Sequence, residues 1–101
     1  ILASKLDRDN GYVKFANGFI IQWGLTWFEN SNTYRDVVLP INCNVLIALA
    51  TDDLSSVTNR GDEFYINWNS GFSNSSNRNS IRFLTNRGNA GNFTWLCIGR
   101  A

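Results

Sequence analysis

The chain has 101 residues, enough for one domain with a modest core of its own. An apolar fraction of 44% and an aromatic fraction of 14% exclude a disordered chain. Nine basic and eight acidic residues are scattered along it and leave a net charge of +1, without the basic stripe that nucleic acids or anionic membranes attract. The longest uncharged apolar run, Val45 to Ala50, is far too short to span a bilayer.

Residues 1–10 show no strand alternation, and Ala3 to Arg8 would hold at most one helical turn. The chain also lacks an initiator Met. We therefore expect Ile1 to mark a cut within a longer polypeptide and residues 1–10 to form a connector.

The first strong signal is a hairpin in residues 11–24, with Asn17-Gly18 at its turn. Asn-Gly is the strongest two-residue hairpin signal, because a type I′ turn needs positive φ at both central positions. The alternation of the second strand places three large apolar side chains on one face, which we expect to pack inward: Phe19, Ile21 and Trp23. Ile20 and Gln22 fall on the other face, where the Gln22 amide is expected to satisfy a neighbouring backbone group.

The next segments predict a second hairpin and a central strand. Leu25–Glu29 and Tyr34–Leu39 flank Asn30-Ser-Asn32, a hairpin candidate. Pro40 is expected to end that second strand, because it lacks the donor that a ladder needs. Val45 to Ala50 is apolar on both faces, which predicts a central strand that is covered from both sides.

The remaining chain also reads as β-structure. Phe64 to Trp68 alternates, with Phe64, Ile66 and Trp68 predicted inward, and two further strands are predicted at 81–84 and 93–98. No segment longer than about ten residues shows helical periodicity. The prediction is an all-β fold, an antiparallel β-sandwich or small barrel of about seven strands.

The two cysteines, Cys43 and Cys97, are too few for a disulfide scaffold. Cys97 shares a predicted face with Phe93 and Trp95, which favours a buried free thiol, while a Cys43–Cys97 bridge stays open as an alternative. Because the chain has no His and no cysteine pair at ligand spacing, we expect no metal site and no cofactor.

The chain carries more apolar surface than a domain of this size can bury. Val45 to Ala50 is apolar throughout, and four aromatic residues lie outside the best inward sets: Trp27, Phe28, Tyr34 and Phe72. We therefore expect contact with another copy of the chain. The alternative is that the sandwich itself covers these residues.

Three stretches resemble a family of C-terminal domains on the tail fibres of tailed bacteriophages. The family's opening signature, G-Y-I-K-F-P-N-G-L-I-I-Q-W-G, is similar to residues 11–24, which read Gly-Tyr-Val-Lys-Phe-Ala-Asn-Gly-Phe-Ile-Ile-Gln-Trp-Gly. Ala16 stands where the family often has Pro. Residues 38–41 and 45–51 resemble its turn and central apolar strand, and residues 93–99 resemble its closing strand. The similarity spans residues 11–101 and is weakest from Asp52 to Asn79.

The resemblance implies a fold, an assembly and a function. It implies a lectin-like β-sandwich in residues 11–101, assembled as a homotrimer, with residues 1–10 connecting it to an upstream fibre region. It implies a tip at the distal end of the tail fibre of a virion, made in the host cytoplasm. This tip would attach the virion to a bacterial surface receptor, either lipopolysaccharide or other polysaccharide or an outer-membrane protein, without nucleic acid and without membrane insertion.

Receptor contacts are expected in the stretch least like the family, because binding residues concentrate on loops held by a rigid scaffold. A sugar site needs an aromatic face together with planar amide, carboxylate or guanidinium groups. The candidate receptor-binding residues are Asp52, Asp53, Arg60, Asp62, Trp68, Phe72, Asn74, Asn77 and Arg78. Trp68 is the least favoured of these, because its alternation places it inward.

Two other functions remain as alternatives. The domain could align and trimerise the fibre without touching a receptor. It could also cleave polysaccharide, which requires paired carboxylates that only the loop acids near Asp52 and Asp62 could supply. Because no His exists, Ser-His-Asp and Cys-His catalysis are excluded, and we expect no enzyme and no catalytic residue.

Overall fold

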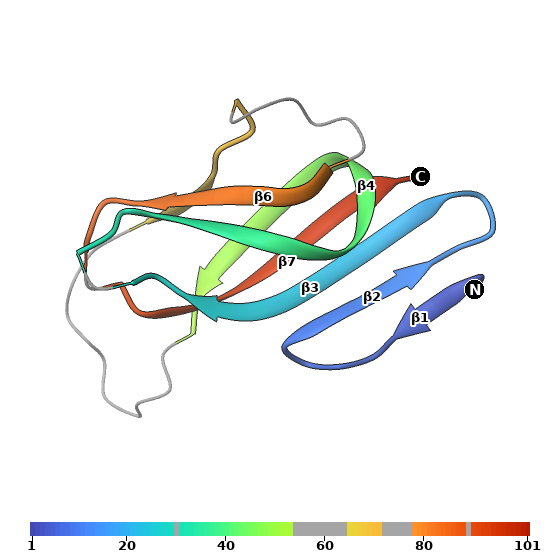
Figure 1. Cartoon of the computed structure of the whole chain (residues 1–101), viewed down its shortest axis with the longest axis horizontal. Helices are drawn as coiled ribbons and strands as arrows, with labels where there is room; N and C mark the ends of the chain where they lie inside the picture. The colour runs from blue at the N-terminus through green and yellow to red at the C-terminus, as the bar shows by residue number, and fades with distance from the viewer. Residues whose placement is uncertain (30, 54–64, 72–77, 89) are drawn as a thin grey trace.

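The computed structural model describes residues 1–29, 31–53, 65–71, 78–88 and 90–101. The predicted all-β fold is confirmed: seven strands pair antiparallel in the order β1-β2-β3-β7-β4-β6-β5. They are β1 (Ala3–Lys5), β2 (Asn10–Lys14), β3 (Phe19–Trp27), β4 (Tyr34–Asp52), β5 (Ile66–Trp68), β6 (Arg78–Thr85) and β7 (Asn92–Arg100) (Figure 1). Among the described residues, no helix is long and apolar enough to cross a membrane.

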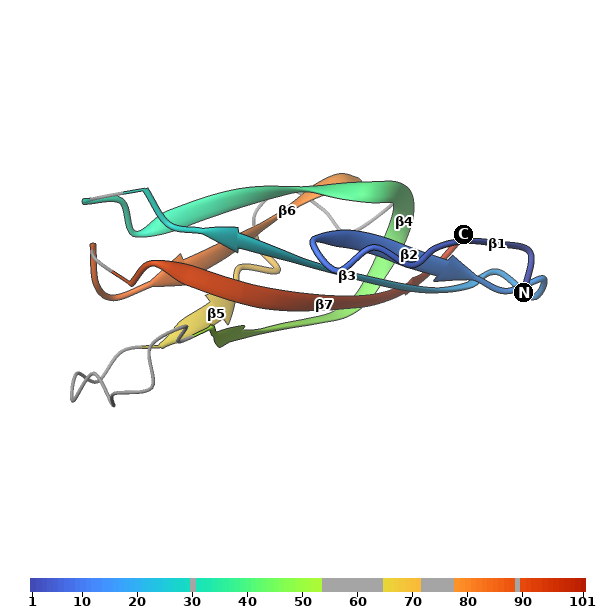
Figure 2. The ribbon, with the colours of Figure 1, turned by 90° about the horizontal axis from the view of Figure 1, so that it is seen from below.

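The 19-residue strand β4 links two layers of the fold. Its first half pairs with β6 and its second half pairs with β7. Figure 2 shows the strand turning from one layer to the other. We call β1, β2, β3, β7 and the second half of β4 sheet A, and the first half of β4 with β6 and β5 sheet B. These two sheets form the predicted sandwich.

Pro40 lies inside β4 and does not end it, so that prediction is wrong. The register with β6 shifts between Val38 and Cys43, and the intervening residues form the bend of the strand. A residue without an N–H is tolerated at such an irregularity, because no ladder bond is lost there. Pro40 therefore interrupts the pairing of β4 without ending the strand.

The core lies between the two sheets. Its buried apolar side chains come mainly from β3, β4, β6 and β7, and the largest fully buried ones are Phe83, Phe93, Ile20 and Ile81. Phe93 is at the centre, stacked on Phe28 at 4.6 Å and against the edge of Phe83 at 5.5 Å. Burying each such side chain contributes about 1.5–3 kcal/mol to folding.

The predicted alternation of β3 is confirmed, but the predicted inward face is wrong. Ile20 and Gln22 are fully buried, whereas Phe19, Ile21 and Trp23 lie on the opposite, partly exposed face. The Gln22 amide can be buried because it is paired with the backbone of the β4 bend: Nε2 donates to the Ile41 carbonyl at 2.9 Å and Oε1 accepts from the Ile41 N–H at 2.9 Å. The expectation that Gln22 satisfies a backbone group is confirmed.

The hairpin between β2 and β3 is confirmed, with a turn different from the predicted type I′. The pair Lys14↔Ile20 closes it, and among its described residues only Gly18 has positive φ, at 91°. The Gly18 N–H donates to the Phe15 carbonyl at 2.9 Å, and the Phe15 N–H donates to the Phe19 carbonyl at 2.8 Å. This is the longer hairpin loop that places a glycine in the left-handed region before the second strand.

Two other local predictions are wrong. Residues 25–29 and 34–39 do not form a hairpin, because β3 pairs with β2 and β7 while the first half of β4 pairs with β6 in the other layer. Residues 3–5 form β1 on the edge of sheet A, where the sequence predicted no strand. A three-residue edge strand with exposed side chains has no alternation to detect.

Both cysteines are free and buried, as the more favoured prediction stated. The hydrogen bond with Cys43 and burial together raise the pKa of the Cys97 thiol. We expect neither thiol to react with a disulfide reagent such as DTNB in the native protein, because Cys43 and Cys97 are 1% and 0% exposed. Mass spectrometry should show two added groups only in denaturant, and rapid labelling of the native chain would contradict this packing.

Candidate functional site

The predicted receptor-binding residues do not form one cluster. Asp52 pairs with Phe93 at the start of β7, and the Asp53 N–H donates to the Asn92 carbonyl at 3.1 Å. We call this end of the sandwich the Asn92 end. Arg78 begins β6 opposite Cys43, beside the β4 bend at the other end of the sandwich. Asp52 and Asp53 therefore lie at the opposite end of the sandwich from Arg78.

Trp68 lies in β5 and packs against the core, so its inward placement is confirmed. Ile66 packs inward with it, also as predicted. The other candidates, Arg60, Asp62, Phe72, Asn74 and Asn77, lie outside the described residues, as does Phe64.

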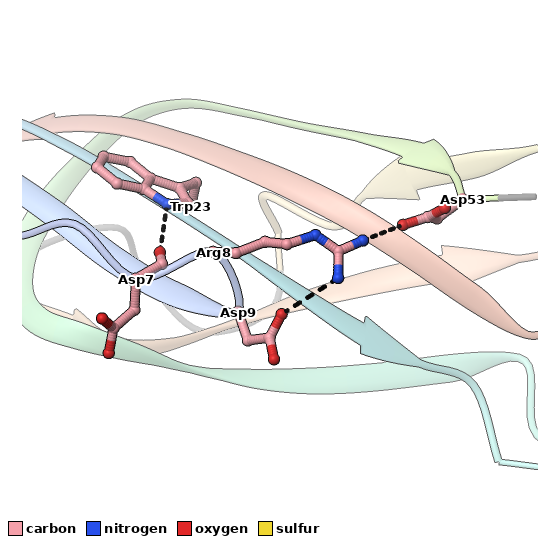
Figure 3. Close-up of polar contacts among 5 residues, drawn as sticks. All are labelled: Asp7, Arg8, Asp9, Trp23 and Asp53. Carbon is pink, nitrogen blue, oxygen red and sulfur yellow. Dashed lines mark hydrogen bonds and ion pairs between the residues drawn. The ribbon is translucent and has the colours of Figure 1, made fainter. Parts of the chain in front are cut away.

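Asp53 is tied to the turn between β1 and β2 (Figure 3). A terminal nitrogen of Arg8 lies 3.4 Å from Oδ2 of Asp53, and the other lies 3.7 Å from Oδ1 of Asp9. In the strand order β3 and β7 separate β2 from β4, so the long Arg8 side chain bridges non-adjacent strands of sheet A. Because Arg8 is mostly exposed, this ion pair contributes at most about 1 kcal/mol.

The same turn explains three residues of the opening signature. The Trp23 indole N–H donates to the Asp7 carbonyl at 2.8 Å (Figure 3). A Cβ on Gly11 would lie 2.5 Å from the Trp23 ring, and a Cβ on Gly24 would lie 2.7 Å from the Asp9 carbonyl oxygen. Gly11, Trp23 and Gly24 therefore fix the β1–β2 turn on sheet A, which gives the signature a structural role.

A group of three side chains at the Asn92 end was missed as a site from the sequence. Trp27 ends β3, and its indole N–H donates to Oε1 of Glu29 at 3.3 Å. Arg35, in β4, places NH1 3.3 Å from the same oxygen and its guanidinium carbon 5.0 Å from the centre of the Trp27 ring. We call these residues the Trp27 cluster. No sequence spacing reveals it, because it joins strands of different sheets.

A second arginine–aromatic group lies on the outer surface of sheet B. Arg82 forms a two-pronged ion pair with Asp36, at 2.7 and 3.0 Å, and its guanidinium lies 4.3 Å from the centre of the Tyr34 ring. The hydrogen bond with Asp36 raises the pKa of Arg82. Asp36 and Arg82 are direct cross-strand partners, so this group strengthens the β4–β6 ladder.

The outer face of sheet A is apolar across three adjacent strands. The register aligns Ile21 with Ile98 and Ile47 in one row, Trp23 with Leu96 and Leu49 in the next, and Leu25 with Thr94 and Thr51 in the third. None of these nine residues is charged. Within the described chain, Leu46, Ile47 and Leu49 are 58%, 43% and 56% exposed, so the prediction that Val45–Ala50 is covered on both sides is wrong for one chain.

A shallow hollow lies on this face between β4 and β7. Its volume is about 430 Å³, and its lining comes from Leu49, Ala50, Thr51, Thr94, Trp95 and Leu96. It contains no ionisable side chain, and no group of three or more potential metal ligands occurs among the described residues. The hollow therefore suits an apolar side chain.

The fold is the one seen in solved pyocin tail fibres. It matches an N-truncated R2-type pyocin tail fibre with a TM-score of 0.74 and 16% identity, covering 97% of this chain and 37% of that one. It matches the R2 pyocin fibre of P. aeruginosa with a TM-score of 0.73 and 16% identity, covering 97% of this chain and 25% of that one.

Sequence comparison gives the family directly. The family described as "Putative tail fiber protein gp53-like, C-terminal" matches residues 14–100, and the chain belongs to it. The resemblance found in the sequence is thus confirmed, and the protein is a tail component. An uncharacterised protein of Methanocaldococcus jannaschii is 40% identical over 40 residues, which are 40% of this chain and 25% of that protein.

Proposed function

We propose that this domain attaches a virion or a phage-tail-like particle to a receptor on the bacterial surface. The observation that carries the proposal is membership of the tail-fibre C-terminal family across residues 14–100. The exposed aromatic, carboxylate and guanidinium groups at the Asn92 end support it, since such groups recognise polar surface ligands. The receptor is a surface glycan or an outer-membrane protein.

In our proposal the Asn92 end faces the host. Leu2 and Ala101 lie at the opposite end, where the Leu2 N–H donates to the Lys14 carbonyl at 2.7 Å and the Ala101 N–H donates to the Gly18 carbonyl at 2.8 Å. Figure 1 shows both termini at this end. Because the family is a C-terminal fibre domain, the rest of the fibre would join beside Leu2. The Asn92 end would then be distal.

Adsorption to bacteria tests this function. Fluorescently labelled protein should bind saturably to some strains of a panel, and an excess of unlabelled protein should block it. Host mutants that lack outer polysaccharide or single outer-membrane proteins then separate the two receptor classes. If an intact assembly binds no strain, the domain serves to align the fibre chains and the attachment proposal is wrong.

A second role, assembly of the fibre, is favoured by the outer face of sheet A. We propose that this face packs against other copies of the chain in a homotrimer. An uncharged face on which seven of the nine aligned residues are apolar can pack against itself, whereas a sugar or a charged protein surface would leave polar groups unpaired against it. The hollow beside Leu49 would accept a side chain of the neighbouring copy.

We further propose that attachment proceeds without cleavage of the receptor. A glycosidase holds two carboxyl groups about 5–10 Å apart across its substrate. Asp52 and Asp53 are adjacent in sequence at a strand end, where successive side chains point in opposite directions, and Asp53 is engaged by Arg8. Purified protein incubated with host polysaccharide should leave the chain length unchanged, and shortened chains would contradict this.

A further inference from the structure

We infer that Trp27, Glu29 and Arg35 form a binding site for a saccharide of the bacterial surface. This inference rests on the proposed attachment function and assigns it a chemical class of ligand and three residues. The site lies at the Asn92 end, since Trp27 pairs with Asn92 across β3 and β7.

The geometry holds an aromatic ring in place while leaving much of it in water. Trp27, the last residue of β3, is 49% exposed, whereas the next residue, Phe28, is buried. The Arg35 guanidinium lies 5.0 Å from the ring centre, and the indole N–H is fixed by Glu29. An arginine at this distance orients the ring by a cation–π contact. The rest of the exposed ring surface can take the apolar C–H face of a pyranose.

Polar groups for sugar hydroxyls surround the ring. Both contacts of Glu29 fall on Oε1, and among the described residues its Oε2 has no hydrogen-bond partner. Arg35 carries five N–H donors, and one of its nitrogens is bonded to Glu29. An acceptor and donors side by side can bind adjacent hydroxyls of one sugar ring in a two-pronged manner.

Stability does not explain this cluster. Ion pairs and cation–π contacts between exposed side chains stabilise a fold only weakly. A protein-binding hot spot would centre the tryptophan in an apolar patch from which water is excluded. Trp27 instead lies at the edge of the apolar outer face of sheet A, with Leu25 as its apolar neighbour on one side. Its cross-strand neighbours are polar: Asn92 is exposed and pairs with it directly, and Asp53 lies on the far side of Asn92. Hydroxylated ligands suit such surroundings better than apolar ones.

The test uses an array of purified bacterial polysaccharides with the wild-type protein and two variants, Trp27→Ala and Arg35→Ala. Both variants should lose binding about tenfold or more, while Trp27→Tyr should keep part of it because the aromatic face remains. The matched control is Phe19→Ala, which removes another exposed aromatic residue of β3 at the opposite end. All variants should keep the oligomeric state of the wild type.

A second readout locates the ligand. The bound polysaccharide should shift the Trp27 indole N–H signal in NMR spectra more than those of the other three tryptophans. The inference is overturned if Trp27→Ala binds like wild type, if Phe19→Ala weakens binding equally, or if no polysaccharide binds. If the protein adsorbs to cells through an outer-membrane protein, the attachment function stands and the saccharide site is wrong. If Trp27→Ala alters the oligomeric state, Trp27 belongs to the assembly interface and the inference also fails.

Discussion

Leu49→Asp is expected to convert the proposed homotrimer into monomers. Leu49 lies in the middle row of the apolar outer face of sheet A, beside Leu96, and is 56% exposed in a single chain. If copies pack on this face, each one would place a carboxylate where water is excluded. Burying an unpaired ion costs several kcal/mol, which is on the order of a thousandfold or more in the association constant.

The measurement is the mass in solution by size-exclusion chromatography with light scattering. Wild type should elute with three times the mass of one chain, and Leu49→Asp with the mass of one chain and an unchanged β-sheet circular dichroism spectrum. The matched control is Val38→Asp, an apolar residue of the same strand that is 71% exposed on sheet B. It should remain assembled. A monomeric wild type, or dissociation by Val38→Asp alone, would place the interface elsewhere.

The outer face of sheet A explains why the sequence predicts the strands well but assigns one face wrongly. The alternation Phe19, Ile21, Trp23 is as regular as that of a core face, and in one chain the larger side chains are expected inside. Two different surfaces compete for apolar residues here, the core and the outer face. A hydrophobic pattern shows that a face is apolar but does not show whether that face fills the core or lies on the surface of the chain.

The sequence also does not predict which strands pair when they are far apart in the chain. Pro40 predicts the end of a strand and residues 30–32 predict the tip of a hairpin, and both are local signals. The bend of β4 depends on Gln22, which is nineteen positions away from Ile41 in the chain. No pattern within a window of ten residues contains this contact. Phe93 and Cys97, by contrast, lie on a strand buried between neighbours, and their local alternation was sufficient.

The candidate site also depends on contacts that the sequence does not show. The sequence predicts Asp52 and Asp53 as receptor contacts because they begin the stretch least like the family, and the structure places both at the Asn92 end. Trp27 and Arg35 were missed as a pair because they meet only when β3 and β4 lie in different layers. A sequence shows which residue types could bind a ligand, whereas the fold decides which of these residues lie together.

Gln22→Leu is expected to destabilise the fold more than any change of a surface residue. Leucine has a similar size and would fill the buried space of Gln22, but it would leave the partly buried N–H and carbonyl of Ile41 without their partners. Each unsatisfied backbone group costs about 1–3 kcal/mol when fully buried, so the two partly buried groups of Ile41 together cost at most about 2–6 kcal/mol. Domains of this size are stable by only about 5–15 kcal/mol, so a large part of the stability would be lost.

Urea unfolding measures this loss, at one fixed protein concentration because the proposed assembly would make the midpoint concentration-dependent. Ile20→Val is the matched control: it lies two residues away on the same buried face and should cost only about 0.5–1.5 kcal/mol. Gln22→Glu should also destabilise, since a carboxylate can accept from the Ile41 N–H but cannot donate to its carbonyl. If Gln22→Leu unfolds at the midpoint of Ile20→Val or above it, the amide does not hold the bend of β4. The opening signature would then owe its glutamine to the assembled fibre rather than to the fold of one chain.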